Sequence, residues 1–237
     1  MNTEYVVTRV LSKETALELK NKFLEYGNWI DGLKSTNGIE KETKNNLEVR
    51  DCVNERNLIQ QYYNKNNKVH NFAYPNTIGL PIISKTLVGG YYNLHFDSPH
   101  NGNVSTTLFL SEPDEYQGGE LELYLDGGVK SFKLEAGKAI LYNTQIPHRV
   151  KKVTKGQRIA SVTWLRSMIP DKNIRKQLWR LHCLDQSLKS RYEDFDREKD
   201  GWNAETLRKS TDNPQFQLKA IIAEIVAQNL IIPEPKD

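Results

Sequence analysis

The sequence predicts a mainly β fold, an antiparallel double sheet of the jelly-roll kind, with helices flanking it at both ends. Two observations lead to this prediction. Between residues 78 and 168, short runs rich in β-branched and aromatic residues alternate with Gly-containing turns, and no helical pattern separates them. Before and after this region, apolar residues recur at helical spacing. Many short strands without intervening helices are typical of sandwiches and jelly rolls, whereas parallel α/β folds interleave the two.

The N-terminal region, residues 1–77, is predicted to be helical. Ser12 is suited to cap a helix and Glu14 to lie in its first turn, and the apolar residues that follow recur at helical spacing. This pattern predicts a helix over 12–26. The same spacing predicts a second helix over 51–63.

Residues 31–49 separate these two helices and differ from them in composition. The stretch is rich in Lys, Asn, Thr and Glu and has few apolar anchors, which predicts a long loop. Such a loop either covers a functional site or is only a solvated connection, because loops of both kinds are common. No motif in the stretch decides between the two.

The central strands are expected as short runs separated by turn residues. Asp126-Gly127 is a signal for a β-hairpin between the runs on either side of it. The expected runs are 82–87, 104–110, 120–125, 129–134, 139–142, 148–153 and 159–164.

Beyond Pro170 the helical spacing returns. It predicts a helix over 171–190 and a last helix that ends before Pro233. Between them, residues 191–209 mix charges of both signs, and we expect a loop with a short helix there. The two longer helices are expected to pack on the sheet rather than to form an independent domain.

Length and composition fit one domain. A chain of 237 residues with 38% hydrophobic content is long enough to bury a sizeable core. We therefore expect a single domain over 1–237. It consists of the N-terminal helical region 1–77, a catalytic jelly-roll core over about 78–168 and a C-terminal helical extension over 169–237.

Charge and cysteine content argue against several classes of protein. Lys and Arg total 33 against 30 Asp and Glu, and the two signs are interspersed, which argues against a nucleic-acid binder. No apolar run approaches the roughly 20 residues that span a bilayer, and the first residues lack a secretion signal. On these grounds we expect a cytoplasmic location. The two cysteines are far apart, so we expect reduced thiols. The sequence does not indicate the oligomeric state.

Three residues in the strand region have the pattern of a metal site. His95 and Asp97 lie two apart in an extended segment, so their side chains point to the same side. His148 follows Pro147 at the start of a later strand. Two histidines and one carboxylate on one side of an octahedral ion leave adjacent positions open, which suits Fe(II) oxygen chemistry. We therefore predict His95, Asp97 and His148 as iron ligands and catalytic residues.

Arg158, ten positions after His148, is predicted to hold a carboxylate. In a strand it shares a face with Ala160, Val162 and Trp164, and this face is expected to point inward. A buried Arg needs an anionic partner, and its guanidinium binds a carboxylate through two parallel hydrogen bonds. An acidic cosubstrate would be such a partner. The alternative is a solvated basic face, since Lys and Arg are frequent around this position.

Other interpretations of these residues are open. A lone His-x-Asp is most often a surface or hydrogen-bonded pair, so the prediction depends on the whole set. A cupin-like jelly roll that binds a metal and a small acid without oxidation would have the same triad but no need for an inward Arg158. A zinc hydrolase would have the same ligands, but no general base is evident beside them. The other histidines, His70, His100 and His182, lack a comparable setting.

A series of motifs surrounds these residues in a fixed order over about residues 80–170. They are Tyr92-Asn93-Leu94-His95-Phe96-Asp97, residues 107–116, Gly118-Gly119-Glu120-Leu121, Gly137, Leu141-Tyr142, Pro147-His148-Arg149-Val150, Gly156-Gln157-Arg158, Trp164 and Ser167-Met168. In this order they resemble the PKHD-type hydroxylases, bacterial relatives of the prolyl 4-hydroxylase catalytic domain. That family lies within the Fe(II)- and 2-oxoglutarate-dependent dioxygenases.

The resemblance implies a double-stranded β-helix core with iron on the histidine–aspartate–histidine triad. It further implies that Arg158 grips the distal carboxylate of 2-oxoglutarate, and that Tyr92 and Trp164 line the site. The implied reaction consumes O2 and 2-oxoglutarate, hydroxylates an unactivated C–H bond and releases succinate and carbon dioxide. Ascorbate is the implied reductant that restores oxidised iron.

One position departs from the family pattern. Some prolyl hydroxylases have a tyrosine near the position of Phe109 that helps to hold the cosubstrate carboxylate, and phenylalanine cannot donate that hydrogen bond. The carboxylate would therefore be bound mainly by Arg158, and the hydroxyl of Thr107 is a candidate for a second hydrogen bond to it. The predicted cosubstrate-binding residues are therefore Arg158, Tyr92, Thr107 and Trp164.

The substrate implied by the resemblance is a prolyl residue of a peptide or protein, and the alternative is free proline or another small molecule. Loops such as 31–49 and 66–80 are expected to select it, and no motif in them identifies it. The sequence therefore predicts the class of reaction more sharply than the substrate.

Overall fold

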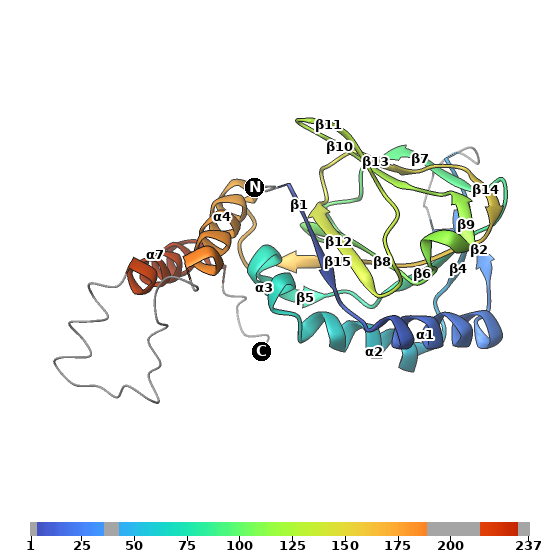
Figure 1. Ribbon diagram of the computed structural model, residues 1–237, viewed down its shortest axis with the longest axis horizontal. Helices are drawn as coiled ribbons and strands as arrows, with labels where there is room; N and C mark the ends of the chain where they lie inside the picture. Colours follow the sequence, from blue (N-terminus) through green and yellow to red (C-terminus); the bar gives the residue numbers. More distant parts are fainter. Residues whose placement is uncertain (1–3, 36–42, 189–213, 232–237) are drawn as a thin grey trace. The chain divides into compact units, whose positions relative to one another are not determined.

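The computed structural model of the chain describes residues 4–35, 43–188 and 214–231. The chain divides into two compact units between Ser167 and Met168. The larger unit contains the strands, and the described residues of the smaller one form helices (Figure 1). That the two units work as a single domain stays a prediction.

The strands of the larger unit form two antiparallel sheets that face each other, as expected for a jelly roll (Figure 1). A separate antiparallel pair joins β14 (Val153–Gly156) to β9 (Tyr116–Gly118). In spatial order, the smaller sheet contains β11 (Gly128–Phe132), β10 (Leu121–Leu125), β13 (His148–Val150), β7 (Tyr91–His95) and β3 (Lys44–Asn45). The larger sheet contains, again in order, β1 (Tyr5–Arg9), β12 (Lys138–Asn143), β8 (Val104–Phe109), β15 (Arg158–Ser167), β6 (Ile82–Thr86), β4 (Leu47–Val49) and β2 (Ile30–Asp31), with β5 (Pro75–Ile78) also paired to β15.

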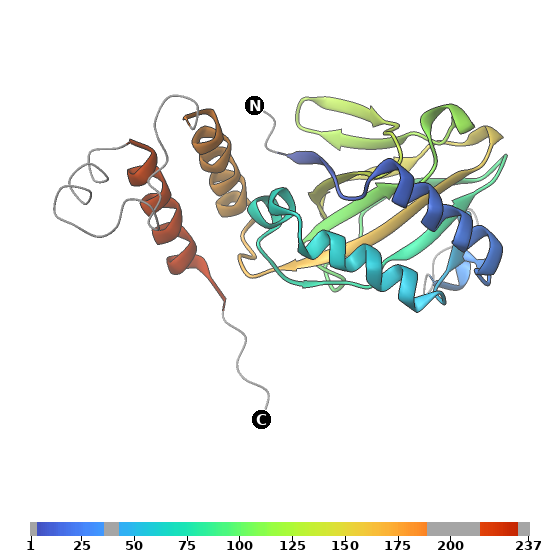
Figure 2. The same cartoon turned by 60° about the horizontal axis from the view of Figure 1, so that its bottom comes forward.

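Two long helices run along the same side of the larger sheet, as Figures 1 and 2 show. They are α1 (Lys13–Tyr26) and α2 (Val53–Asn64), and they confirm the two helices predicted in this region. The Ser12 side chain accepts a hydrogen bond from the backbone N–H of Thr15, so it caps α1 as expected. The short helices η1 (Gly32–Ser35), α3 (Asn67–Ala73) and η2 (Pro113–Glu115) were not predicted.

The central strand β8 is buried along its whole length because both faces of its sheet are covered. On the helix side, the hydroxyl groups of Tyr63 and Thr106 are 2.7 Å apart in a hydrogen bond that joins α2 to the strand. On the other side, Phe109 joins an apolar cluster that spans the two sheets. Its other buried members are Leu121, Leu123, Phe132, Ile140 and Tyr142. This cluster fills part of the interior and leaves the remainder to a cavity.

The predicted runs match the observed strands closely, and the hairpin at Asp126-Gly127 is confirmed, because Leu125 pairs with Gly128 across β10 and β11. The predicted run 148–153 is two short strands, β13 and β14. The sequence analysis did not predict β1, which pairs with β12 at the edge of the larger sheet. A single short strand without flanking turn signals gives little local pattern to detect.

The predicted loop over 66–80 was wrong where α3 and β5 form. The predicted loop over 31–49 was wrong where η1, β3 and β4 form. In the smaller sheet Lys44 pairs with Tyr92, and in the larger sheet Glu48 pairs with Ser84. The segment therefore passes from one sheet to the other. Lys44 Nζ lies 2.7 Å from Glu48 Oε1, and both residues are about as buried as the apolar core, at 4% and 5% exposure. Residues 36–42 lie outside the described part of the chain.

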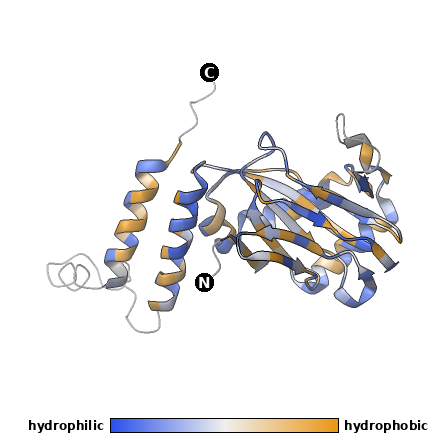
Figure 3. Ribbon diagram, turned by 90° about the horizontal axis from the view of Figure 1, so that it is seen from above, coloured by the Kyte–Doolittle hydropathy of each residue, from blue (hydrophilic) through white to orange (hydrophobic). Residues whose placement is uncertain are grey.

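The smaller unit consists of α4 (Lys172–Leu188) and α7 (Pro214–Asn229), which lie against each other. Both fall where helices were predicted, and residues 191–209, where a loop was predicted, lie outside the described residues. Figure 3 shows that α7 is largely hydrophobic. None of the described helices has the length and apolarity needed to span a membrane. That these helices pack on the sheet stays a prediction.

The ion pair between Lys44 and Glu48 yields a prediction about stability. Lys44→Met removes one partner and leaves the Glu48 carboxylate buried beside Arg50, whose Nη2 lies 3.4 Å from Oε2. We expect the free energy of unfolding to fall by about 3 kcal/mol, because a buried charge that loses its close partner is costly. Urea denaturation measures the change.

The double variant Lys44→Met/Glu48→Leu provides the control, since it removes both charges together. It should regain part of the stability lost in Lys44→Met. A double variant less stable than the single variant would show that the cost does not arise from the broken ion pair.

Candidate metal centre and cavity

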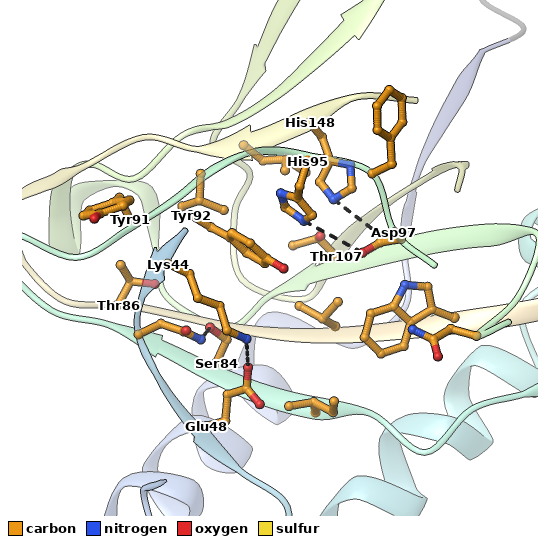
Figure 4. A pocket seen from close by; sticks show the side chains of 18 of the residues that line it. Lys44, Glu48, Ser84, Thr86, Tyr91, Tyr92, His95, Asp97, Thr107 and His148 are labelled. Carbon is orange, nitrogen blue, oxygen red and sulfur yellow. Dashed lines mark hydrogen bonds and ion pairs between the residues drawn. The ribbon is translucent and has the colours of Figure 1, made fainter. Parts of the chain in front are cut away.

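The three predicted metal ligands converge in the structure (Figure 4). His95 is the last residue of β7 and His148 the first of β13, and the two pair directly across the strands. Nε2 of His95 lies 3.9 Å from Oδ1 of Asp97, and Nε2 of His148 lies 3.5 Å from Oδ2. Asp97 lies just beyond the end of the strand that was predicted to contain it, yet its carboxylate still faces both imidazoles.

Backbone contacts fix the orientation of both imidazole rings. Nδ1 of His95 lies 2.7 Å from the carbonyl oxygen of Asn93, and Nδ1 of His148 lies 3.0 Å from that of Ile146. A carbonyl can only accept, so each Nδ1 carries the proton and donates it. Each Nε2 is then left with a lone pair directed at the carboxylate of Asp97, as a metal ligand requires.

Burial keeps His95 in the neutral form that binds a metal. Removal from water, together with the neighbouring His148, lowers the pKa of His95 to about 4. Because this pKa lies well below 7, His95 is unprotonated near neutral pH, and a proton does not compete with a metal for its Nε2.

A buried hydroxyl orients the carboxylate ligand. Ser105, on the strand β8, donates a hydrogen bond of 2.6 Å to Oδ2 of Asp97. Ser105 is fully buried, so this interaction is shielded from water. Such contacts to a ligating carboxylate set its orientation and strengthen metal binding.

The triad opens into a cavity of about 650 Å³. Its floor is formed by the strands β8, β15 and β6 of the larger sheet and its roof by β7 and β13 of the smaller one. The ring of Tyr92 stacks on His95 with centroids 3.6 Å apart, and Tyr142 meets His148 edge-on at 5.0 Å. Burial and the charge of Asp97 raise the pKa of Tyr92 to about 12, so its hydroxyl stays protonated.

Arg158 lines the same cavity and is 2% exposed. Its Nε and Nη2 have no hydrogen-bond partner among the described residues. The ring of Phe109 lies 5.4 Å from the guanidinium carbon, in the range of a cation–π contact. Burial lowers the pKa of Arg158, and neighbouring Tyr116 and Tyr142 counteract the shift. A buried cation that lines a cavity and has unpaired nitrogens is suited to binding an anion.

All the predicted site residues line this one cavity. Tyr92, Thr107 and Trp164 do so together with Arg158 and the triad. The alternation that placed Arg158 on an inward face with Val162 and Trp164 is confirmed. His70, His100 and His182 are not part of the metal-ligand cluster that the described residues form.

Sequence reasoning missed several residues of the cavity and its support. Neither Tyr142 nor Ser105 was predicted as a site residue. The hydroxyl residues inside the otherwise buried run 104–109 were a signal for Ser105, because a buried hydroxyl needs a partner. The part of the lining that residues 44–50 provide was also missed. It contains Lys44, Asn46, Glu48 and Arg50, which alternate as strand residues do.

Comparison with known proteins agrees with this geometry. Residues 82–166 match the family model of the 2OG-Fe(II) oxygenase superfamily. A PKHD-type hydroxylase of Teredinibacter turnerae is 35% identical over 198 residues, which cover 78% of this chain and 86% of that protein. The chain belongs to the PKHD-type hydroxylases. The PKHD-type hydroxylase YbiX of Escherichia coli is also 35% identical, over 79% of this chain and 89% of that protein.

Solved structures share the fold of this PKHD-type hydroxylase. A prolyl hydroxylase from Trichoplax adhaerens, in complex with a peptide fragment of the hypoxia inducible factor oxygen degradation domain, aligns with a TM-score of 0.58. It is 14% identical and covers 75% of this chain and 87% of its own. A Pseudomonas putida prolyl-4-hydroxylase aligns with a TM-score of 0.50 at 16% identity, over 69% of this chain and 92% of its own.

Membership of this family makes the chain an Fe(II)- and 2-oxoglutarate-dependent dioxygenase that hydroxylates its substrate. The residues present fit the iron. Two imidazole nitrogens and one carboxylate oxygen lie within 4.8 Å of one another, and the hydrogen bonds behind them leave their lone pairs free. This donor set suits Fe(II) with open positions.

The hydroxyl of Ser105 gives a test of the centre that does not require turnover. Ser105→Ala removes the hydrogen bond to Asp97, and we expect the affinity for Fe(II) or Mn(II) to fall by about tenfold or more, as for other partners of metal ligands. Competition with a metal-binding dye under anaerobic conditions measures the affinity.

Ser161→Ala is the matched control. Ser161 is equally buried, lies in the neighbouring strand β15, and its hydroxyl has no partner among the residues that the structure describes. Its metal affinity should stay unchanged. An equal loss of metal affinity in both variants would mean that metal binding is weakened by general loosening of the sheet and not by loss of the Asp97 contact.

Proposed function

We propose that this dioxygenase hydroxylates a prolyl residue of a peptide or protein. The observation that supports the reaction most directly is the pairing of two features in one cavity. The triad of His95, Asp97 and His148 is suited to Fe(II), and Arg158 in the same cavity is a buried cation suited to the acid end of 2-oxoglutarate. Either feature alone would fit several kinds of protein, but together they match a metal and a dicarboxylate cosubstrate.

In this proposal each predicted residue has a role. His95, Asp97 and His148 hold the iron, and Arg158 binds the distal carboxylate of 2-oxoglutarate. Tyr92 covers His95 and lines the path to the metal. The hydroxyl of Thr107 and the indole of Trp164 lie on the same cavity wall and contact the cosubstrate or the substrate.

The chemistry that iron supplies with O2 and 2-oxoglutarate is hydroxylation of a C–H bond coupled to decarboxylation to succinate. The protein contributes orientation and exclusion of water. The backbone carbonyls behind the two histidines and the hydroxyl of Ser105 hold the ligand atoms at fixed directions. Arg158 fixes the far end of the cosubstrate, which leaves its 2-oxo acid end directed at the metal.

The prolyl substrate is proposed from the relatives. Two of the solved structures that share the fold are prolyl hydroxylases, and one of them contains a peptide. The cavity also has more room than a small dicarboxylate needs, at about 650 Å³. Free proline or another small molecule is the alternative, and the charged wall formed by Lys44, Glu48 and Arg50 favours a substrate with polar groups.

The non-oxidative cupin-like alternative explains less of the structure. It requires the metal triad but gives no reason for a buried Arg158 with unpaired nitrogens. Ascorbate as the reductant stays a prediction from the family resemblance. The cytoplasmic location stays a prediction from the lack of an apolar membrane-spanning run and of a secretion signal in the first residues.

A panel of peptides with and without proline tests the proposal. With Fe(II), 2-oxoglutarate and O2, the full-length protein should add one oxygen to a proline-containing peptide, measured as a mass gain, and release succinate in equal amount. Asp97→Ala should abolish both products, because the metal loses its carboxylate ligand.

The outcomes separate the class of reaction from the substrate. Oxygen added to free proline or to a peptide without proline would overturn the peptidyl-prolyl substrate and keep the dioxygenase. No visible charge-transfer band on anaerobic addition of Fe(II) and 2-oxoglutarate to folded protein would contradict the residue roles themselves.

The role of Arg158 has its own prediction. Arg158→Gln should weaken 2-oxoglutarate binding by at least about 30-fold, since the cosubstrate carboxylate loses its charged partner in a buried site. Binding is measured by calorimetry on metal-free protein, where the carboxylate contact is not masked by chelation. Unchanged affinity would show that another group holds the acid.

A further inference from the structure

Tyr116 lies beside Arg158 although the two are distant in sequence. Tyr116 begins β9 and pairs with Gly156 of β14, two residues before Arg158 begins β15. Gly119, at φ +68°, lies between them. A Cβ atom at Gly119 would stand 3.1 Å from Cε2 of Tyr116 and 3.2 Å from Cδ of Arg158. The ring edge and the arginine stem therefore pack against the same glycine.

Both side chains have unused hydrogen-bonding groups at this contact. Tyr116 is 2% exposed, and its hydroxyl has no partner among the described residues. Nε and Nη2 of Arg158 are likewise buried without partners in that part of the chain. Burial raises the pKa of Tyr116, and the charge and hydrogen-bonding groups of Arg158 oppose the shift. The two side chains are therefore close enough to interact, although no hydrogen bond of normal geometry joins the Tyr116 hydroxyl to the guanidinium. Leaving three such groups unpaired is costly unless a bound state pairs them.

We propose that Tyr116 is a positioning residue for Arg158. When the acid end of the cosubstrate is bound, the Tyr116 hydroxyl accepts an N–H of the guanidinium, and the remaining N–H groups point to the carboxylate in the cavity. Tyr116 does not line the cavity, so it acts through Arg158 and not by touching the cosubstrate. The inference rests on the proposed role of Arg158.

The surroundings show why Tyr116 is suited to this role. On the guanidinium, the ring of Phe109 offers only a cation–π contact and no hydrogen-bond acceptor. The ring of Tyr116 is held from another side, because Lys133 Nζ donates a hydrogen bond of 2.6 Å to the Tyr116 carbonyl and lies 4.3 Å from the ring centroid. The hydroxyl is therefore presented to Arg158 by a ring that is already fixed.

The ring and the hydroxyl can be separated by one substitution. Tyr116→Phe keeps the packed ring and removes a hydroxyl that has no partner among the described residues, so the fold should not lose stability. We expect the Kd for 2-oxoglutarate to rise about fivefold, since a hydrogen bond to a charged group is lost. At saturating cosubstrate the turnover rate should stay close to that of the unmodified protein.

The measurement is an anaerobic titration of Fe(II)-loaded protein, followed by the charge-transfer band. The probes are 2-oxoglutarate and 2-oxobutyrate, which chelates the metal in the same way but lacks the distal carboxylate. Tyr116→Phe should weaken the binding of 2-oxoglutarate and leave the binding of 2-oxobutyrate unchanged. Tyr124→Phe is the matched control, because Tyr124 lies on β10 outside the cavity lining and should leave both affinities unchanged.

Two results would overturn the inference. One is an unchanged affinity for 2-oxoglutarate in Tyr116→Phe, and the other is an equal loss for both acids, which indicates a general structural effect. Failure of the unmodified protein to bind 2-oxoglutarate would be a different result, since it would overturn the role of Arg158 first and this inference with it.

Discussion

The direct pairing of His95 with His148 across β7 and β13 is the constraint on which the site depends. It brings the two imidazoles to 4.2 Å between centroids and directs both Nε2 atoms to one side of the smaller sheet. A register shift of one residue would turn one histidine to the opposite face, because side chains alternate along a strand. The carboxylate of Asp97 can then complete the set from the chain that leaves β7, without a strand of its own.

The triad and Arg158 differ in how their polar groups are satisfied. In the triad, both Nδ1 atoms and the Asp97 carboxylate have protein partners. In Arg158, which lines the same cavity, Nε and Nη2 lack partners among the residues that the structure describes. Preformed support is what a metal site needs, since the ligand directions must be set before the ion arrives. Unpaired nitrogens are what an exchangeable acid needs, because the cosubstrate itself must supply the missing partner.

The triad and Arg158 were predicted by combining local patterns from three segments of the sequence. His95 and Asp97 are two residues apart, Arg158 shares the alternation of its own strand, and His148 was added from a separate strand. Ser105 and Tyr116 could not be found in this way. Neither contact follows from a local pattern. Ser105 on β8 reaches the Asp97 carboxylate just beyond the end of β7, a strand of the other sheet, and Tyr116 packs against the same glycine as Arg158.

Lys44, Glu48 and Arg50 line the cavity but lie outside residues 82–166, the segment that matches the superfamily model. The metal ligands and Arg158 all lie inside that segment. Reaction chemistry and this part of the wall are thus encoded in different stretches of the chain. A change in residues 44–50 alters the charge and shape of the cavity wall, and at Lys44 it also acts next to β7, because Lys44 pairs with Tyr92.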